Sequence, residues 1–446
     1  MKKRLFKKTV AVLTVAAMAA SLAACSGSSS GTTTAADTQA ASSDSDSDAS
    51  SEAESTDSGD SQETIKIAAF FNMSGANADA GLRDKEGTDL AIEDINNAGG
   101  IKALGGRKLE VVYGDTLSDV SQAKAVTERV LADESIVAAV GVGGSAYAAP
   151  QLPIIEKNKI PYILFGTSAS LTEQGYQYIF RTTSYGGDTG LFGKAQVQFL
   201  EWLEENQGIN ATKVGIIYEN SDYGISLAES NRTQVEEAGF DVVYEESYPI
   251  GLTDASALVA NCKSSGAEAV FISSFPQEAK MITNAMKSIN YFPVIVGGGG
   301  GFLFPEYATA LGDDVEGSVS VASSSFDCQT VLDSDYSDVP ERYKEKYGVF
   351  MCEHAVTAYN NIIILADALE RAGTTDREAL TQAIRETNLM TMQAGGPVQF
   401  DEVGNNVNAV PVIVQWQKQD DGVYEAVTIW PESEATAEYQ PIGTAE

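Results

Sequence analysis

The fold is decided by the stretch LEVVYGDTLSDVSQAKAVTERVLADESIVAAVG at residues 109–141. Two short apolar runs, LEVVYG (109–114) and IVAAVG (136–141), are typical of strands that are buried on both faces. Between them, four apolar residues recur at helical spacing with charged residues in the gaps: Val120, Ala123, Val126 and Val130. Strand, amphipathic helix and strand together predict a parallel βαβ unit.

The same alternation continues on both sides of this unit. IKIAAF (65–70) and PYILF (161–165) add two buried strands to the first series. A second series begins after Arg181 with helices and strands over 190–205, 213–219, 224–238, 241–246 and 267–273. This repetition predicts an α/β fold with two Rossmann-like lobes.

The last hundred residues have too few elements to form a domain alone. One late helix carries apolar residues on a single face: Ala355, Tyr359, Ile362, Ala366 and Leu369. Strands are expected after it, near 397–400 and 410–416. We therefore expect these segments to return and complete the two lobes.

The first 25 residues have the pattern of a lipoprotein signal. MKKRLFKK precedes an apolar run over 9–24, and LAAC at 22–25 places small residues before a cysteine. Residues 1–24 are thus expected to be removed and Cys25 to be lipidated. The alternative is an ordinary signal peptide with a chance cysteine, whereas a membrane-spanning helix would need about 20 apolar residues.

Residues 25–63 are expected to begin with the lipidated cysteine and to continue as a disordered acidic linker. From Ser26 to Glu63 the chain has no Lys, Arg or aromatic residue, so it cannot bury enough apolar surface to fold. Its position after the lipid site favours a spacer, and the alternative is an acidic interaction tail.

Composition excludes several classes of function. With 29 Lys and Arg against 63 Asp and Glu, the chain carries a net charge of −34, which makes nucleic acid a poor partner. The single histidine, His354, cannot complete a metal site or a catalytic triad. We therefore predict no enzyme activity, no catalytic residue, no metal and no cofactor.

Besides Cys25, three cysteines are present, without the close spacing of a metal site: Cys262, Cys328 and Cys352. In an exported protein Cys328 and Cys352 could form a disulfide, and two free buried thiols are the equal alternative.

The loops that follow the predicted strands are rich in Gly, Ser and Thr. Ligands of open α/β sheets bind at the carboxyl ends of the strands, where exposed N–H groups suit a carboxylate. The alternative for any one loop is that these residues only make turns. The loops cover 71–81, 141–148, 165–172, 220–224, 273–277 and 297–301.

Several of these loops carry a family resemblance. SGANADAGLRDKEGTDLAIEDINNAGGI (74–101) resembles the opening of leucine/isoleucine/valine-type solute-binding proteins of ABC transporters. Three further motifs follow in the family's order, and the likeness covers about 64–430. They are VGVGGSAYAAP (140–150), GTSASLTEQGYQYIFRTT (166–183) and YENSDYGISLAES (218–230).

The resemblance implies a type I periplasmic-binding fold, in which two lobes are joined by three crossovers and close on a ligand. The N-terminal lobe is then expected to comprise 64–183 with about 323–393. The C-terminal lobe would comprise about 184–322 with about 394–446.

The resemblance also implies a set of ligand-binding residues. In the first lobe the hydroxyls of Ser145 and Thr167 would hold a carboxylate, with main-chain groups near Gly143 and Phe165 assisting. The aromatic rings of the second lobe would be Tyr223 and Phe275. The alternatives are helix caps for Ser145 and Thr167 and ordinary packing for Tyr223.

One departure from the family concerns the ligand's ammonium group. Many members have an acid after the strand that ends near Val296, where this chain reads VGGGGGF. Gly299, inside this run, is expected either to line the pocket or only to make a turn. Either another acid, such as Glu353 or Asp327, reaches the cleft, or the ligand is a carboxylate or amide without an α-amino group. For Glu353 a helix cap is the alternative.

The resemblance implies a binding subunit that captures a small amino-acid-like solute outside the cytoplasm, anchored to the membrane by lipid on Cys25. Its partners would be an ABC permease and an ATPase. A ligand sensor that signals to a membrane receptor is the alternative.

Overall fold

The computed structural model describes residues 63–441, apart from 142 and 186–189. The predicted signal peptide, Cys25 and all but the last residue of the expected linker lie outside the described residues. Within the described ranges, no helix combines the length and the apolar character that crossing a membrane requires.

The first lobe is built on a five-stranded sheet in which all neighbouring strands are parallel. The strand order is β2-β1-β3-β4-β5. Four of these strands match the predicted runs to within a residue or two. The bounds are β1 Ile65–Phe71, β2 Leu109–Asp115, β3 Ile136–Gly141, β4 Tyr162–Leu164 and β5 Ile179–Arg181.

Helices alternate with these strands as the βαβ pattern predicts. Asp119 caps the helix between β2 and β3, because its carboxylate accepts a hydrogen bond of 2.8 Å from the Ser121 N–H. The helices are α1 Ala78–Asn97, α2 Val120–Val130, α3 Ser145–Ala148 and α4 Leu152–Asn158.

The second lobe is built on a seven-stranded mixed sheet with the order β12-β11-β10-β9-β8-β6-β7. Strands β6 to β10 pair in parallel, and β11 and β12 are antiparallel. The bounds are β6 Lys213–Glu219, β7 Asp241–Tyr248, β8 Ala269–Ser273, β9 Val294–Gly297, β10 Val319–Ala322, β11 Val412–Lys418 and β12 Tyr424–Trp430.

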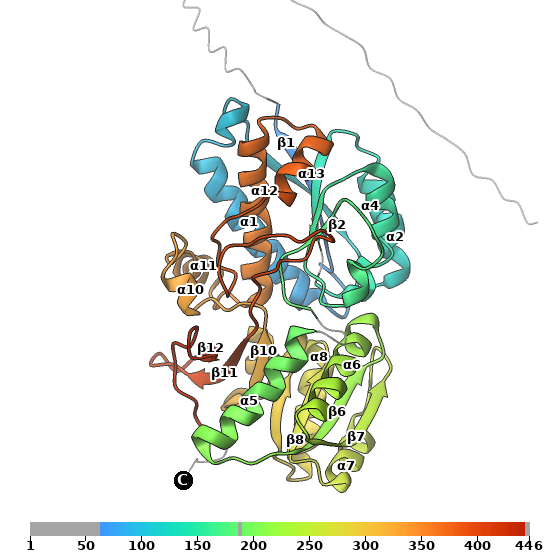
Figure 1. The fold of residues 1–446 in the computed structure, drawn as a ribbon, viewed down its shortest axis with the longest axis vertical. Coiled ribbons are helices and arrows are strands. Elements are labelled where there is room, and N and C mark those ends of the chain that lie inside the picture. Colours follow the sequence, from blue (N-terminus) through green and yellow to red (C-terminus); the bar gives the residue numbers. More distant parts are fainter. Residues whose placement is uncertain (1–62, 142, 186–189, 442–446) are drawn as a thin grey trace, which may run out of the picture. The chain divides into compact units, whose positions relative to one another are not determined.

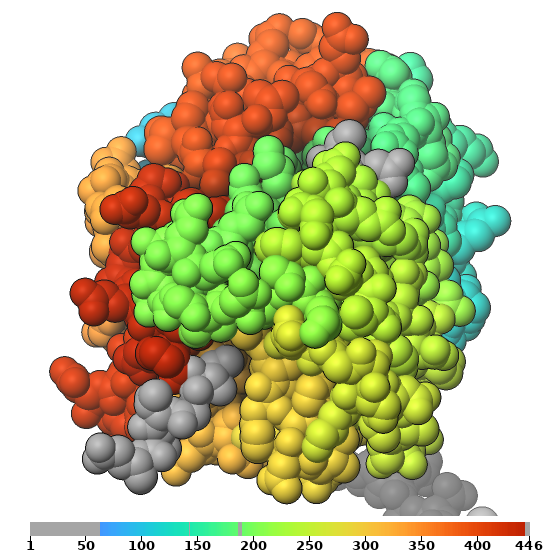
Figure 2. Space-filling model, turned by 60° about the horizontal axis from the view of Figure 1, so that its bottom comes forward, coloured from blue at the N-terminus to red at the C-terminus, as the bar shows by residue number. Residues whose placement is uncertain are grey.

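Helices of the second lobe pack on this sheet. In Figure 2, α5 (green) lies at the surface beside α6 (yellow-green), with which it packs. The helices are α5 Leu191–Gln207, α6 Asp222–Glu237, α7 Ser256–Ser265, α8 Pro276–Ser288 and α9 Pro305–Leu311.

The chain passes between the two sheets three times, and Figure 1 shows the result as two lobes. It leaves the first sheet after β5, returns after β10, and enters the second sheet again at β11. After β10 it forms α10 Gln329–Leu332, α11 Val339–Tyr347, α12 Glu353–Ala372 and α13 Arg377–Arg385. Helix α12 packs along α1, where the Tyr359 hydroxyl donates to Asp94 at 2.8 Å. The α/β fold with two lobes and three crossovers is therefore confirmed.

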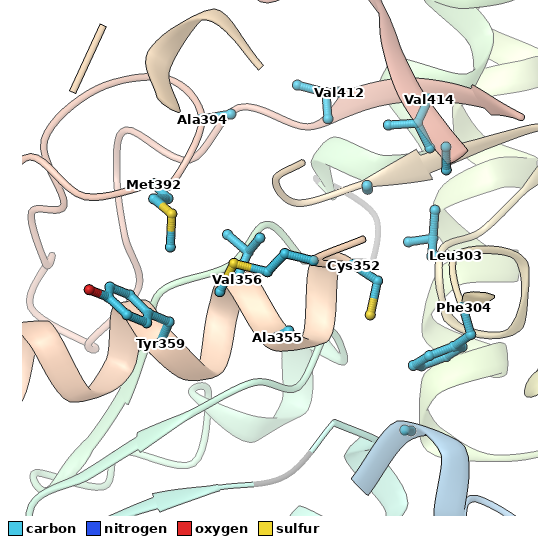
Figure 3. Packing of buried hydrophobic residues seen from close by; sticks show 14 of the residues in the cluster. Leu303, Phe304, Cys352, Ala355, Val356, Tyr359, Met392, Ala394, Val412 and Val414 are labelled. Carbon is cyan, nitrogen blue, oxygen red and sulfur yellow. The ribbon is translucent and has the colours of Figure 1, made fainter. Parts of the chain in front are cut away.

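One hydrophobic cluster extends through both lobes. Its residues from the two lobes pack together near the start of α12. Figure 3 shows Leu303 and Phe304 of the second lobe near Cys352, which directly precedes this helix. Val412 and Val414 of β11 belong to the same cluster. The late segments thus complete the core of each lobe, as their apolar pattern predicts.

The expected strand near 397–400 is wrong. Val398 and Phe400 make only isolated bridges, and the Phe400 ring packs against Phe180 at 5.2 Å because this segment covers the edge of the first sheet. The Arg181 N–H also donates to the Gly404 carbonyl at 2.8 Å. These contacts place the return to the second sheet later than the expected position near 394. The sequence pattern does not predict strands β10 and β12, because β10 is short and β12 contains a charged residue.

The cysteines of the body carry no disulfide. Cys262, Cys328 and Cys352 are all free and buried. Of the two alternatives for Cys328 and Cys352, the free buried thiols are the ones observed.

Candidate functional site

A small cavity lies between the two lobes, at the carboxyl ends of strands from both sheets. Its volume of about 30 Å³ has room for one or two water molecules. From the first lobe it is lined by Gly144, Phe165, Gly166, Thr167, Glu353 and His354. From the second lobe it is lined by Phe192, Tyr223, Phe275, Gly298 and Gly300.

The loops after β3 and β4 supply the first-lobe hydroxyls. Thr167 lines the cavity, but Ser145 does not. Ser145 is 1% exposed, and its Oγ accepts a hydrogen bond of 2.9 Å from the Ser168 N–H. Ser145 thus holds the loop that presents Thr167. It does not cap α3, because Gly144 precedes that helix and no side chain caps it.

Gly143 contributes to the site by having no side chain. Its carbonyl accepts a hydrogen bond of 3.2 Å from the Asn72 amide. A Cβ at this position would lie 2.1 Å from Cε1 of His354, so any side chain would collide with the imidazole. The neighbouring Gly144, rather than Gly143, lines the cavity.

His354 was not expected to line the cavity. Its Nδ1 lies 2.9 Å from Oδ1 of Asp84, and both side chains are buried. The imidazole also packs against the rings of Phe165 at 4.5 Å and Phe304 at 4.7 Å. Among the described residues, no group of three His, Cys, Asp or Glu side chains could hold a metal ion.

Two aromatic residues close the second-lobe side, and both stand at helix starts. Ser221 caps α6 through the Gly224 N–H, which places Tyr223 in the first turn. Phe275 immediately precedes Pro276, the first residue of α8. The two rings lie 5.7 Å apart, and Phe275 also contacts Tyr147 of the first lobe at 6.4 Å.

The Tyr223 hydroxyl is a neutral donor. It donates to the Gly298 carbonyl at 2.8 Å, and burial raises the pKa of Tyr223 well above its ordinary value. This bond joins α6 to the glycine run after β9.

The glycine run over 297–301 is packed too closely to carry side chains at several positions. Gly300 has a φ of +51°, and a Cβ there would lie 2.7 Å from the Ser274 carbonyl oxygen. Gly298 and Gly300 line the cavity, whereas the Gly299 N–H donates to Oγ of Ser320 at 3.1 Å. The run therefore forms part of the cavity surface as well as a turn. The N–H of Gly299 points into the second lobe, where it is hydrogen-bonded to Ser320.

Of the two acids named as alternatives for an ammonium group, only Glu353 lines the cavity. It begins α12, is 4% exposed, and accepts a hydrogen bond through Oε1 from the Ser323 N–H. Burial raises the pKa of its carboxyl group, and the Ser323 N–H opposes that shift. Asp327, the other alternative, does not line the cavity and instead accepts hydrogen bonds from Ser325, Thr428 and Thr436.

Phe192, near the start of α5, is the residue of the site for which the sequence carried no signal. It follows the first crossing between the lobes, and only the packing of the lobes brings it to the cavity.

A family model described as a periplasmic binding protein matches residues 64–422. The chain belongs to this periplasmic binding protein family. Its members are solute-binding proteins and not enzymes. The type I fold and the leucine/isoleucine/valine-type resemblance are both confirmed.

Relatives of this periplasmic binding protein support the assignment along most of its length. The Leu/Ile/Val-binding protein homolog 7 of Brucella suis biovar 1 (strain 1330) is 30% identical over 383 residues, which cover 84% of this chain and 93% of the relative. The leucine binding protein LivK of Thermotoga maritima is 25% identical, with a TM-score of 0.69 and coverage of 83% and 99%. LivJ of Streptococcus pneumoniae, solved with isoleucine, is 26% identical, with a TM-score of 0.67 and coverage of 82% and 100%.

Proposed function

We propose that this protein captures a small amino-acid-like solute outside the cytoplasm and delivers it to the permease and ATPase of an ABC importer. The observation that carries the proposal is a cavity lined by both lobes at the carboxyl ends of their strands. A ligand that contacts both lobes stabilises the closed form, because it binds that form more tightly than the open one.

The residues proposed to bind the solute are Thr167 with the loop held by Ser145, the rings of Phe165, Tyr223 and Phe275, and the backbone near Gly143 and Gly299. Hydroxyl and backbone donors on one side suit a carboxylate, and three aromatic rings suit an apolar side chain. The similarity to leucine-binding and isoleucine-bound proteins supports a branched amino acid or a related compound as the solute.

The cavity is smaller than an amino acid, so entry requires the lobes to part or the side chains to move. Opening between two lobes by a hinge is the usual motion of such folds. The proposal therefore includes closure around the solute.

The lipid anchor belongs to the same proposal. Lipid on Cys25 and the spacer over 26–63 would keep the binding lobes near a permease at the outer face of the cytoplasmic membrane. The small residues before Cys25 and the acidic composition after it support this arrangement.

A thermal-shift screen tests the proposal. A compound that binds only the folded state raises the apparent melting temperature as its concentration exceeds Kd. The screen covers the twenty amino acids, branched keto acids and small amides. Stabilisation by at least one of them is expected, and the absence of any shift at millimolar concentration would contradict the proposed solute class.

A further inference from the structure

The charge of the cavity surface is one-sided. Among the described residues that line it, Glu353 is an acid and none is Lys or Arg. His354 has its Nδ1 2.9 Å from the buried Asp84 carboxylate. Burial raises the pKa of Glu353, and beyond burial the attraction to His354 lowers this pKa while the repulsion from Asp84 raises it. A cation that entered the cavity would therefore meet one acid and no Lys or Arg among the described residues that line it.

The side chain of Glu353 is held in place by one of its oxygens. Oε1 accepts the hydrogen bond from the Ser323 N–H, which follows β10 on the segment that crosses between the lobes. This bond fixes the carboxylate at the junction of the lobes, with α12 behind it.

The other oxygen lies toward the glycine run of the second lobe. A Cβ at Gly299 would be 3.8 Å from Oε2 of Glu353. Gly298 and Gly300 of this run line the same cavity as Glu353. The first lobe therefore places an acid opposite the loop of the second lobe that lacks one.

We propose that Glu353 binds the ammonium group of the solute, which makes the ligands of this protein α-amino acids and excludes the corresponding acids without an amino group. The proposal rests on the proposed function. A buried carboxylate is costly unless a cation pairs with it, and an ammonium group would supply that cation. A ligand with a carboxylate and no ammonium would instead bring a second negative charge beside Glu353.

The arrangement divides recognition between the lobes. Thr167 and Glu353 both belong to the first lobe, so this lobe would contact both charged groups of an amino acid. The rings of Tyr223 and Phe275 would then cover its apolar part on closure. The ammonium-binding acid thereby lies on the first lobe and not on the loop after β9.

Titration calorimetry on the full chain with L-isoleucine and 3-methyl-2-oxopentanoate tests the proposal. Wild type is expected to bind isoleucine at least about tenfold more tightly than its keto acid, as a charged hydrogen bond implies. Glu353→Gln keeps an acceptor for the Ser323 N–H. In this variant the affinity for isoleucine should fall at least about tenfold, and the ratio of the affinities for isoleucine and its keto acid should decrease. If another amino acid is the ligand, it is compared with its own keto acid.

Glu278→Gln is the matched control. Glu278 is also a buried acid in the first turn of a helix, and its Oε1 accepts from the Gly251 N–H at 3.2 Å, but it does not line the cavity. This variant should leave both affinities unchanged. The melting temperature of each variant shows whether it is folded.

If wild type binds the amino acid and its keto acid equally, the inference that Glu353 binds an ammonium group is overturned, while the proposed solute capture stands. This comparison needs no variant. Unchanged isoleucine affinity in a folded Glu353→Gln would also overturn it. Binding of none of the amino acids, keto acids or amides would overturn the proposed function itself.

Discussion

Arg83 of α1 and Glu306 of α9 form an ion pair between the two lobes, with Nη2 of the guanidinium 2.8 Å from Oε1 of the carboxylate. The Arg83 side chain is 8% exposed, so this pair is shielded from solvent on its first-lobe side. Arg83 also pairs with Glu86 on its own helix. Loss of Glu306 would therefore weaken the contact between the lobes without leaving Arg83 unpaired.

We expect Glu306→Gln to destabilise the closed form by about 1–2 kcal/mol, which is the order of one charged hydrogen bond. Solute affinity should then fall roughly 5- to 30-fold. Calorimetry measures the affinity, and small-angle scattering measures compaction. Asp314→Asn is the control, because Asp314 pairs with Lys287 within the second lobe and is 64% exposed. If Glu306→Gln and Asp314→Asn bind the solute equally tightly, the ion pair between Arg83 and Glu306 does not stabilise the closed form.

Tyr223 is predicted to act through its ring more than its hydroxyl. Tyr223→Phe removes only the bond to the Gly298 carbonyl, which lies within the second lobe, and should cost about 0.5–1.5 kcal/mol of folding free energy with little change in solute affinity. Tyr223→Ala also removes the contact with Phe275 and should weaken binding, with a smaller ligand-dependent decrease in radius of gyration. Similar affinities for Tyr223→Ala and wild type would show that the ring does not cover the solute.

Glu219 at the end of β6 should make stability depend on pH. Burial raises the pKa of this carboxyl to about 7, although a hydrogen bond with Ser221 opposes the shift. The folded state therefore holds a proton that the unfolded state loses near pH 4.5. Stability from this group is complete below pH 4.5 and is lost as pH rises toward and through 7.

Over this pH range, the free energy of unfolding falls by on the order of 3 kcal/mol at most because of Glu219. Glu219→Gln should remove this decrease and leave a protein more stable than wild type at pH 8. Urea unfolding at pH 5 and pH 8 measures it, with Glu246→Gln on the exposed face of β7 as the control. The same pH dependence in wild type and Glu219→Gln would mean that Glu219 does not titrate as described.

The thiols of Cys328 and Cys352 should not react in the native protein. Burial raises the pKa of each to about 12, so neither forms an appreciable thiolate at pH 8. Alkylation followed by mass spectrometry, which reads each cysteine separately, should label them only after unfolding. Fast native labelling at either position would show that the site opens, and a disulfide-linked peptide would contradict the free thiols.

Cys25 is predicted to carry the lipid anchor. Cys25→Ala should move the protein from the membrane fraction to the soluble fraction while its melting temperature stays unchanged, because the binding lobes begin after residue 63. Cell fractionation and mass spectrometry of the mature N-terminus measure this. Firm membrane retention of the variant, with no lipid on wild type, would refute the anchor.

Local pattern predicted most of the strands. Runs such as 214–217 and 136–141 are apolar, as strands buried on both faces must be, and the predicted bounds 213–219 and 136–141 matched the structure. Pattern failed at Val398 and Phe400, which make only isolated bridges, and Phe400 packs against Phe180 of β5 without joining its ladder. It also missed β12, which pairs with β11 and forms one edge of the second sheet.

The sequence by itself determined the α/β class, the order of the elements and the loops at the strand ends, because burial and helix spacing are properties of neighbouring residues. Only the tertiary structure decided which side chains of those loops meet. Glu353, His354 and Phe192 lie far from Thr167 along the chain, and the three crossings bring them to one cavity. Such long-range contacts depend on how two completed cores pack together, which no local spacing records.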